Sequence, residues 1–299
     1  MKRIKKSSAS ITGALMLCAA LILTAGMLVA CGGKAGDGAV DGGSGESAAL
    51  SGALTIEGSD TMVNLSQAWA ESFMADNPEV MLTVKGGGSG AGIASLLNDT
   101  TDFANASRAV KDEEIEQGAA NGVEVVQTAV ARDGIAVIIN SANGVDNIST
   151  EDLGKMYRGE ITDWKEVGGS TGKIVLLGRD TSSGTYEFFQ EAVVGKEAEY
   201  AKSMRNMQSN QAIVDEVKGN PQAIGYVGMG YEDPNTKVVN VDGVAATSDA
   251  VRDGSYALSR ELFMDSNGTP AGLAKAFLDW ILGSAGQQIV TDEGFVTLN

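Results

Sequence analysis

The sequence contains no histidine and only two cysteines among its 299 residues. Without an imidazole, the chain can form neither a Ser-His-Asp triad nor a zinc site with histidine ligands. Basic residues are also scarce, with 22 Lys and Arg against 39 Asp and Glu, so the formal net charge is −17. A surface of this charge repels nucleic acid and offers no basic face to anionic lipid.

The first thirty residues are predicted not to belong to the fold. Four basic residues lie among the first six, and an apolar run extends from Ile11 to Val29. This order is typical of a secretory signal, although the run is also long enough for an uncleaved membrane anchor. The sequence Leu28-Val29-Ala30-Cys31 resembles the lipobox of bacterial lipoproteins, which favours a signal at 1–30 and a lipid on Cys31. Residues 31–50 are then the lipidated cysteine and a flexible, glycine-rich tether.

This N-terminal interpretation accounts for both cysteines. Cys18 leaves with the signal and Cys31 carries lipid, so no thiol remains for a disulfide, a metal or a nucleophile. Residues 1–30 hold four basic residues and no acidic one, so their removal takes the net charge from −17 to −21. Because such a chain repels free anions at long range, any anion site must depend on short-range donors in a dry pocket.

The most informative stretch is 173–194, where a buried strand is predicted to lead into a helix. The strand should cover Ile174–Leu177 and stop at Gly178, and the small polar residues 181–183 are good N-caps for a helix that ends at Gly195. A helix N-terminus binds anions through its free N–H groups, and Arg179 adds a planar fork of donors. The alternative is a capped helix beside a surface arginine.

The same design occurs twice more, which favours the anion site. The strand 53–56 is followed by Ser59, Asp60 and Thr61 and then by an amphipathic helix, although simple capping also explains these three residues. The strand 80–84 is followed by the glycine-rich run 86–92, whose N–H groups can converge on an anion. The spacing of these glycines does not fit the dinucleotide-binding fingerprint, because Ala91 stands where a glycine is needed.

Strands alternating with helices predict an α/β fold with largely parallel sheets, in which ligands bind at the carboxyl ends of strands. Apolar strands at 123–130 and 134–139, separated by Arg132-Asp133, indicate a crossing between two lobes. The extended segment 256–264 indicates the return crossing. We therefore expect lobe I to comprise 51–131 plus 256–299, and lobe II to comprise 132–255, with the ligand in the cleft between them.

Several motifs in this order resemble those of the phosphate-binding lipoproteins of bacterial ABC importers, the phosphate-specific transport family. The resemblance runs from about Leu54 to the C-terminus and implies the two-lobed periplasmic-binding-protein fold (type II), with a hinge of two crossing strands, closing on one phosphate. The motifs are Gly58-Ser-Asp-Thr61, Gly88-Ser-Gly90, Asp102-Phe-Ala-Asn-Ala-Ser-Arg108, Tyr157-Arg-Gly-Glu-Ile-Thr-Asp-Trp164, Arg179-Asp-Thr-Ser-Ser-Gly-Thr185 and Ala223-Ile-Gly-Tyr-Val227.

The resemblance also implies which residues contact the ligand. By position, the phosphate-binding residues are Ser59, Asp60, Thr61, Ser89, Gly90, Ser107, Arg179, Ser182, Ser183, Gly184 and Thr185. Arg108 is expected to support the site from outside. Some members of the family have an aspartate at the position of Ser107 that accepts the proton of the bound phosphate, and here Asp60 is the carboxylate available. No cofactor and no metal are implied; the partners are inorganic phosphate, the membrane permease subunits and, through Cys31, the membrane, for a monomeric binding protein.

The sequence leaves three alternatives open. The same fold could bind another tetrahedral oxyanion, such as sulfate, molybdate or tungstate, although a carboxylate at Asp60 repels a fully deprotonated anion. The chain could instead be a serine hydrolase or phosphatase that uses Ser183 or Ser89. No histidine can serve as its base, and Ala91 stands where a nucleophile elbow at Ser89 needs glycine. A sensor or adhesin role for the same domain is also compatible with the sequence.

Overall fold

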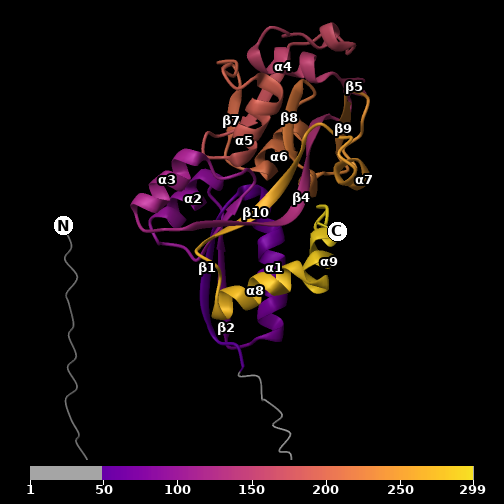
Figure 1. Ribbon diagram of the computed structural model, residues 1–299. Coiled ribbons are helices and arrows are strands. Elements are labelled where there is room, and N and C mark those ends of the chain that lie inside the picture. The colour runs from indigo at the N-terminus through magenta and orange to yellow at the C-terminus, as the bar shows by residue number, and fades with distance from the viewer. Residues whose placement is uncertain (1–48, 299) are drawn as a thin grey trace, which may run out of the picture. The chain divides into compact units, whose positions relative to one another are not determined.

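The computed structural model describes residues 49–298 and shows an α/β fold built on one curled sheet of ten strands (Figure 1). Its main path has the order β2-β1-β3-β10-β4-β8-β6-β7, with β5 and β9 joined beside β4. The predicted α/β class is therefore confirmed. The signal, the tether up to residue 48 and Cys31 lie outside the described residues.

Three parallel strands form one end of the sheet. β1 (Gly52–Gly58) lies between β2 (Val80–Lys85) and β3 (Phe103–Ala106) and pairs with both in parallel register. The amphipathic helix predicted after Thr61 is α1 (Val63–Asp76), whose apolar side chains Leu65, Trp69 and Phe73 are buried. The remaining helices of this end are η1 (Asp60–Met62), α2 (Ser89–Leu97), α3 (Asp112–Ala120), α8 (Gly272–Leu282) and α9 (Ser284–Asp292).

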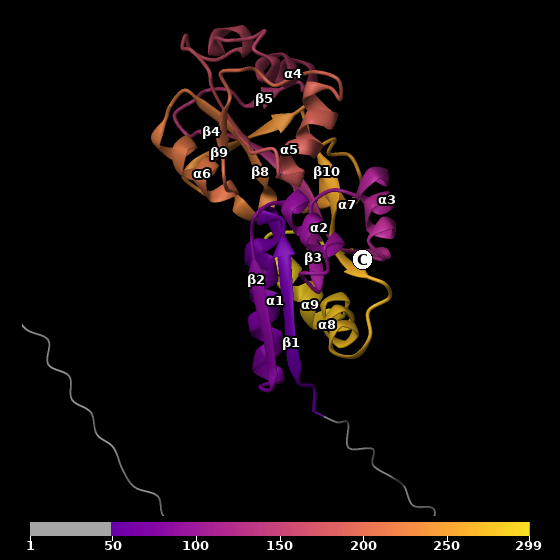
Figure 2. The same cartoon turned by 90° about the vertical axis from the view of Figure 1, so that its left-hand side faces the viewer.

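Two long antiparallel strands join this end to the other. β4 (Val125–Asn140) pairs with β10 (Ser259–Asn267) through its first half and with β8 and β9 through its second half. Both strands can be followed through the middle of the fold in Figures 1 and 2. The two crossing strands of the hinge are thus present. The prediction of two separate strands around Arg132-Asp133 is wrong, however, because the ladder with β10 continues through this charged pair.

The other end of the sheet carries the stretch that the sequence singled out. Its strands are β5 (Asn147–Ile148), β6 (Val175–Arg179), β7 (Arg205–Met207), β8 (Ala223–Gly228) and β9 (Thr236–Val241). Its helices are α4 (Thr150–Arg158), η2 (Trp164–Val167), α5 (Gly184–Phe189), the π-helical turn η3 (Gln190–Val194), α6 (Asn210–Gly219), η4 (Met229–Tyr231) and α7 (Ser248–Arg252).

Both boundaries of the strand in this stretch differ from the prediction, since β6 begins at Val175 rather than at Ile174. The strand does not stop at Gly178, because Gly178 and Arg179 continue the parallel ladder with β7, opposite Asn206 and Met207. Arg179 is therefore the last residue of β6 and is held by the sheet rather than by a loop. This register fixes where its side chain starts, at the carboxyl end of a strand.

Candidate functional site

The three predicted turns all follow the carboxyl ends of strands, and the structure brings them together. β1 ends at Gly58 before Ser59 and Asp60, β2 ends at Lys85 before the glycine-rich run 86–92, and β6 ends at Arg179 before the turn 180–183. Each turn, together with Ser107 directly after β3, contributes polar groups to one buried region between the two ends of the sheet.

Ser89, Ser107 and Gly184 form the most closely packed part of this region. The Ser89 hydroxyl oxygen accepts a hydrogen bond from the Ser107 backbone N–H at 3.0 Å and lies 3.2 Å from the Ser107 hydroxyl. A Cβ atom placed on Gly184 would overlap the Ser89 hydroxyl oxygen and lie 2.9 Å from that of Ser107. Because both serines are fully buried, only a residue without a side chain fits at position 184.

The glycine-rich loop after β2 contacts the turn after β6 through the backbone. The Gly90 N–H donates a 3.0 Å hydrogen bond to the carbonyl of Ser182. Gly88 has a φ of +97°, and a Cβ there would lie 2.5 Å from the same carbonyl, so this approach requires glycine. The Ser182 hydroxyl lies 2.6 Å from a carboxylate oxygen of Asp180 and 3.0 Å from the carbonyl of Gly87. Ser182 therefore joins the two loops.

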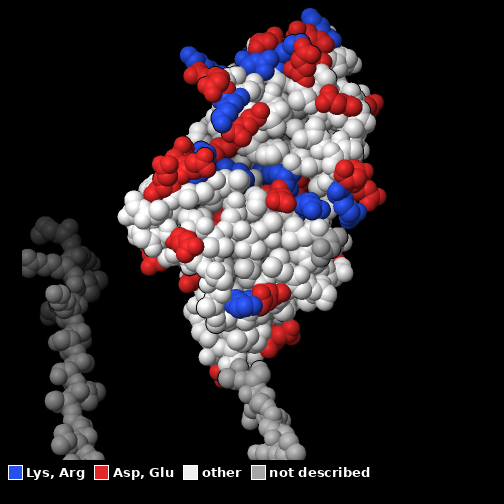
Figure 3. Space-filling model, in the orientation of Figure 1, with Lys and Arg blue, Asp and Glu red and all other residues white. Residues whose placement is uncertain are grey.

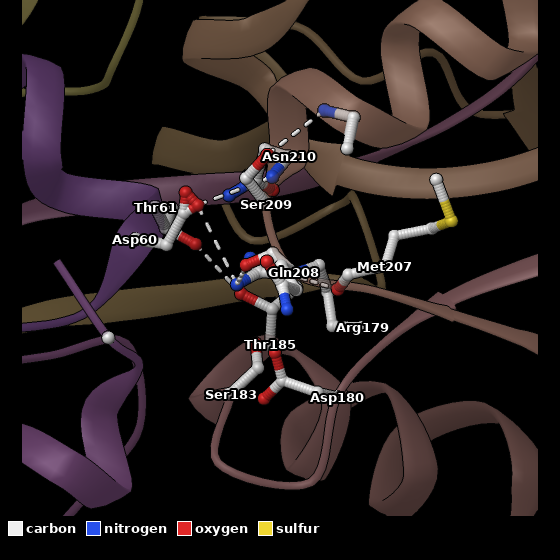
Figure 4. A network of polar contacts seen from close by, with 12 residues as sticks. Asp60, Thr61, Arg179, Asp180, Ser183, Thr185, Met207, Gln208, Ser209 and Asn210 are labelled. Carbon is white, nitrogen blue, oxygen red and sulfur yellow. Dashed lines mark hydrogen bonds and ion pairs between the residues drawn. The ribbon is translucent and has the colours of Figure 1, made fainter. Parts of the chain in front are cut away.

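Arg179 is the arginine that the sequence predicted to contact the ligand. Its side chain is 1% exposed. Its Nη2 donates to the carbonyl of Gln208 at 3.0 Å, and its Nε donates to that of Met207 at 3.4 Å. These bonds and the nearby Asp60 carboxylate can be followed in Figure 4. The buried Nη1 has no hydrogen-bond partner among the described residues. The guanidinium thus keeps unused donors in a dry environment, which suits an oxyanion.

Asp60 reaches across from the other end of the sheet. Its Oδ2 lies 3.6 Å from Nη2 of Arg179 and accepts a 3.3 Å hydrogen bond from the backbone N–H of Asn210, the first residue of α6 (Figure 4). The Tyr231 hydroxyl donates to the Asp60 carbonyl at 2.8 Å. Burial raises the pKa of the Asp60 carboxyl, while the charge of Arg179 and the Asn210 N–H oppose that rise.

Thr61 and Thr185 are in direct contact, with their hydroxyl oxygens 2.8 Å apart and both side chains buried. Beside them lies a buried ion pair that sequence reasoning missed. Arg260 donates to Oδ2 of Asp133 from Nε at 3.0 Å and from Nη2 at 2.7 Å. The available signal was that each of the two predicted crossing segments contains charged residues, among them Asp133 and Arg260. Their proximity could not be read from the sequence because 127 positions separate them.

The two remaining serines differ in their local roles. The Ser183 hydroxyl accepts a 3.4 Å bond from the backbone N–H of Tyr186 and so caps α5, as its position predicted. Ser59 is 2% exposed and makes no side-chain capping bond, although it precedes η1. The simple capping explanation for Ser59 is therefore wrong. α2 also begins without a side-chain cap at Gly88.

Arg108 directly follows Ser107 and forms ion pairs with two acidic side chains. Its Nη1 and Nη2 each donate to a carboxylate oxygen of Glu114 at 2.8 Å, and its Nε lies 2.6 Å from Glu187. Lys111 lies 3.1 Å from the same Glu187 oxygen. The acidic side chains of α3 that flank these basic groups gather on the face shown in Figure 3. The guanidinium of Arg108 thus links the α3 region to α5.

The arrangement can bind a small oxyanion. Residues 49–298 contain no group of three or more Asp, Glu, His or Cys side chains placed to hold a metal ion. Within these residues, no helix has the length and apolar content needed to cross a bilayer.

Residues 43–285 match the model of the PBP superfamily domain. The chain belongs to the PBP superfamily. Over 286 residues it is 34% identical to the phosphate-binding protein PstS of Staphylococcus saprophyticus, covering 91% of this chain and 86% of the relative. It is also 34% identical to the protein of that name from Bacillus subtilis, covering 92% of each chain. These relatives place it in the PstS family within the PBP superfamily and confirm the family that the sequence motifs indicated.

Solved structures of PBP proteins agree with the two-lobed fold. A phosphate ABC transporter substrate-binding protein from Clostridium perfringens, solved with bound phosphate, superposes with a TM-score of 0.77 at 34% identity. The superposition covers 83% of this chain and 100% of that structure. An ABC-type phosphate transport receptor from Vibrio cholerae gives a TM-score of 0.69 at 29% identity, covering 82% and 99% of the two chains.

Proposed function

We propose that this chain captures inorganic phosphate and delivers it to the permease subunits of an ABC importer. Relatives named phosphate-binding protein and a similar structure with bound phosphate support the ligand and the transport role. The proposal includes cleavage after residue 30, a lipid on Cys31 that anchors the chain outside the cytoplasm, and a monomeric, non-enzymatic binding protein. The lobes would be 51–131 plus 256–299 and 132–255.

The observation that carries the proposal is the unpartnered Nη1 of the buried Arg179. Burying a guanidinium donor without a partner is costly, so a ligand that accepts its hydrogen bonds gains much of that free energy on binding. A phosphate oxygen is such an acceptor, and the guanidinium geometry suits two oxygens at once. The proposed ligand set is Ser59, Asp60, Thr61, Ser89, Gly90, Ser107, Arg179, Ser183, Gly184 and Thr185, with Ser182 joining the loops around it.

Asp60 gives the site its preference for phosphate over sulfate in this proposal. The dianion of phosphate retains one hydrogen, which it can donate to the Asp60 carboxylate. Sulfate has no such hydrogen and would place a lone pair against that carboxylate, a mismatch that costs about 1–3 kcal/mol or more. The side chain is 14% exposed, so little water can screen the mismatch.

Calorimetric titration of the full chain in detergent, first freed of bound anion, tests the proposal. We expect tight phosphate binding and sulfate binding weaker by about 100-fold, with Asp60→Asn reducing this ratio to about tenfold or less. Asp215→Asn is the matched control, since that carboxylate is 59% exposed and pairs with Lys218 on the surface of α6. Absence of phosphate binding, or equal affinity for the two anions in the unchanged chain, would contradict the proposal.

A further inference from the structure

The buried ion pair Arg260–Asp133 lies where the two crossing strands face each other. The two residues are direct cross-strand partners in the antiparallel ladder between β10 and β4. Asp133 is fully buried and the Arg260 side chain is 3% exposed. The second carboxylate oxygen of Asp133 accepts a 3.0 Å hydrogen bond from the backbone N–H of Met229, so the acid is fixed from two directions.

The guanidinium of Arg260 reaches three segments of the proposed phosphate site. Its Nη1 donates to the carbonyl of Ser107 at 3.0 Å, and its Nη2 donates to the hydroxyl oxygen of Thr185 at 3.0 Å. The Thr61 hydroxyl oxygen lies 3.5 Å from the same nitrogen. The ring of Phe188 covers the guanidinium, and the distance from Cζ of Arg260 to the ring centroid is 5.6 Å. Arg260 therefore contacts residues that follow β1, β3 and β6.

The direction of these hydrogen bonds follows from the chemistry of arginine, which donates hydrogen bonds and accepts none. Thr185 must therefore use an oxygen lone pair toward Arg260. Thr61 and Thr185 together have two hydroxyl hydrogens, and their mutual contact uses only one of them. The other hydrogen cannot point at Arg260 and is left for an acceptor in the site. In a series of linked hydrogen bonds such as this one, the charged guanidinium also polarises the hydroxyls that follow it and strengthens the hydrogen bonds that they donate.

We propose that Arg260 and Asp133 are a positioning pair for anion binding, which leaves one hydroxyl hydrogen of the Thr61–Thr185 pair to be donated to the bound phosphate. This inference rests on the proposed function. Asp133 neutralises Arg260, so the pair supplies direction without adding net charge, and it joins the two crossing strands where the proposed lobes meet. A buried ion pair of this kind is weak evidence for stability, since well-packed apolar residues often replace one without loss. Its contacts with the site explain its presence better.

The test compares stability with phosphate affinity in the full chain. In the double variant Arg260→Met with Asp133→Leu, both charges are replaced by apolar side chains, so we expect the melting temperature without ligand to stay close to that of the unchanged chain. Its phosphate affinity should nevertheless fall by roughly 10- to 100-fold. If the pair had only a structural role, phosphate affinity would change only where stability also changed.

A coupling measurement identifies the route of the effect. If Arg260 acts through the threonine, Thr185→Val alone should weaken phosphate binding, and adding it to the double variant should cause little further loss. Arg260→Lys provides a second variant that keeps the charge opposite Asp133 but loses the planar fork, and it should also bind phosphate more weakly.

The outcomes separate this inference from the proposed function. The positioning role alone would be overturned if the double variant bound phosphate within about twofold of the unchanged chain. Should the double variant not fold, the same result in Arg260→Lys would overturn it. Fully additive effects of Thr185→Val would also overturn the stated route. If the unchanged chain bound no phosphate, the proposed function would fall together with this inference.

Discussion

Gly184 packs directly against Ser89, and a methyl group at position 184 would overlap the serine hydroxyl. Gly184 begins α5 at one end of the sheet, while Ser89 begins α2 at the other end. The two helix N-termini therefore approach each other as closely as backbone and hydroxyl permit. This contact brings the first N–H groups of both helices to the same buried region, where each carries positive partial charge.

Gly184→Ala is expected to weaken phosphate binding by about tenfold or more, because overpacking a buried contact costs about 1–3 kcal/mol. The new methyl group must push α5 away from Ser89 and Ser107. Titration calorimetry measures the change. The matched control is Gly219→Ala in α6, where an added Cβ meets nothing within 4 Å, and this variant should bind as the unchanged chain does. Equal affinity of both variants would show that the contact is unimportant for binding.

Arg179→Lys is expected to reduce phosphate affinity by roughly 100-fold although the charge is kept. A lysine ammonium cannot donate to the carbonyls of Met207 and Gln208 in the positions of the guanidinium and also serve a ligand. Competition between phosphate and sulfate in the calorimeter would quantify the loss. Arg205→Lys, at a side chain that is 51% exposed and pairs with Glu216, should leave affinity unchanged. Retention of full affinity in Arg179→Lys would remove the central role given to the fork.

Glu187→Gln tests the ionic contact between α5 and the segment before α3. Glu187 receives both Arg108, at 2.6 Å, and Lys111, at 3.1 Å, and the change leaves these two cations without that partner. We expect phosphate affinity to fall by about tenfold, because a charge-assisted contact is worth about 1.5–3 kcal/mol and the carboxylate is partly exposed. The loss should shrink in high salt, which already weakens the contact in the unchanged chain.

Glu191→Gln is the control for this prediction, since Glu191 is an exposed acid on the following turn. It removes the same charge from the same region but not from the ion pair. Binding curves for both variants at low and high salt complete the measurement. An equal loss in the two variants would mean that net charge, and not the contact with Arg108, sets the effect.

Asp265→Asn tests a buried acid on β10 that lies next to the same ionic cluster. The side chain is fully buried opposite Gln127 on β4. Burial raises its pKa to about 7, and the charge of Glu114 adds to this rise, whereas Gln127 and Arg108 act to lower the pKa. Between the unfolded pKa of about 3.9 and this value, the folded chain holds a proton that the unfolded chain has lost. Stability should therefore fall as pH rises through this range and then level off.

Asp265→Asn should remove that slope. Relative to the unchanged chain, the variant should gain stability between about pH 4 and about pH 7, by up to roughly 4 kcal/mol. Urea unfolding at several pH values measures this difference. Asp249→Asn, at a side chain that is 92% exposed, should keep the slope of the unchanged chain. The same pH slope in Asp265→Asn and the unchanged chain would be incompatible with an ionisation linked to folding at this position.

Much of the candidate site could be predicted because its parts are local in sequence. Small polar residues directly after an apolar strand identify a helix start, and this placed Ser59, Ser89 and Ser183 at turns that the structure confirms. The strand boundary at Gly178 was misplaced because a glycine weakens a strand on its own, whereas here the ladder with β7 continues the strand to Arg179.

The sequence by itself determined the alternating strands and helices and the polar turns at strand ends, because periodicity, capping and glycine act within a few residues. The lack of histidine likewise limited the available chemistry. Only the tertiary structure decided which arginine has a free donor. Arg108 lies two residues beyond β3 and Arg179 is the last residue of β6, yet the first is paired with Glu114 and Glu187 while the second keeps an unpartnered Nη1. The same is true of Arg260 and Asp133, since burial and partners depend on how distant strands pair.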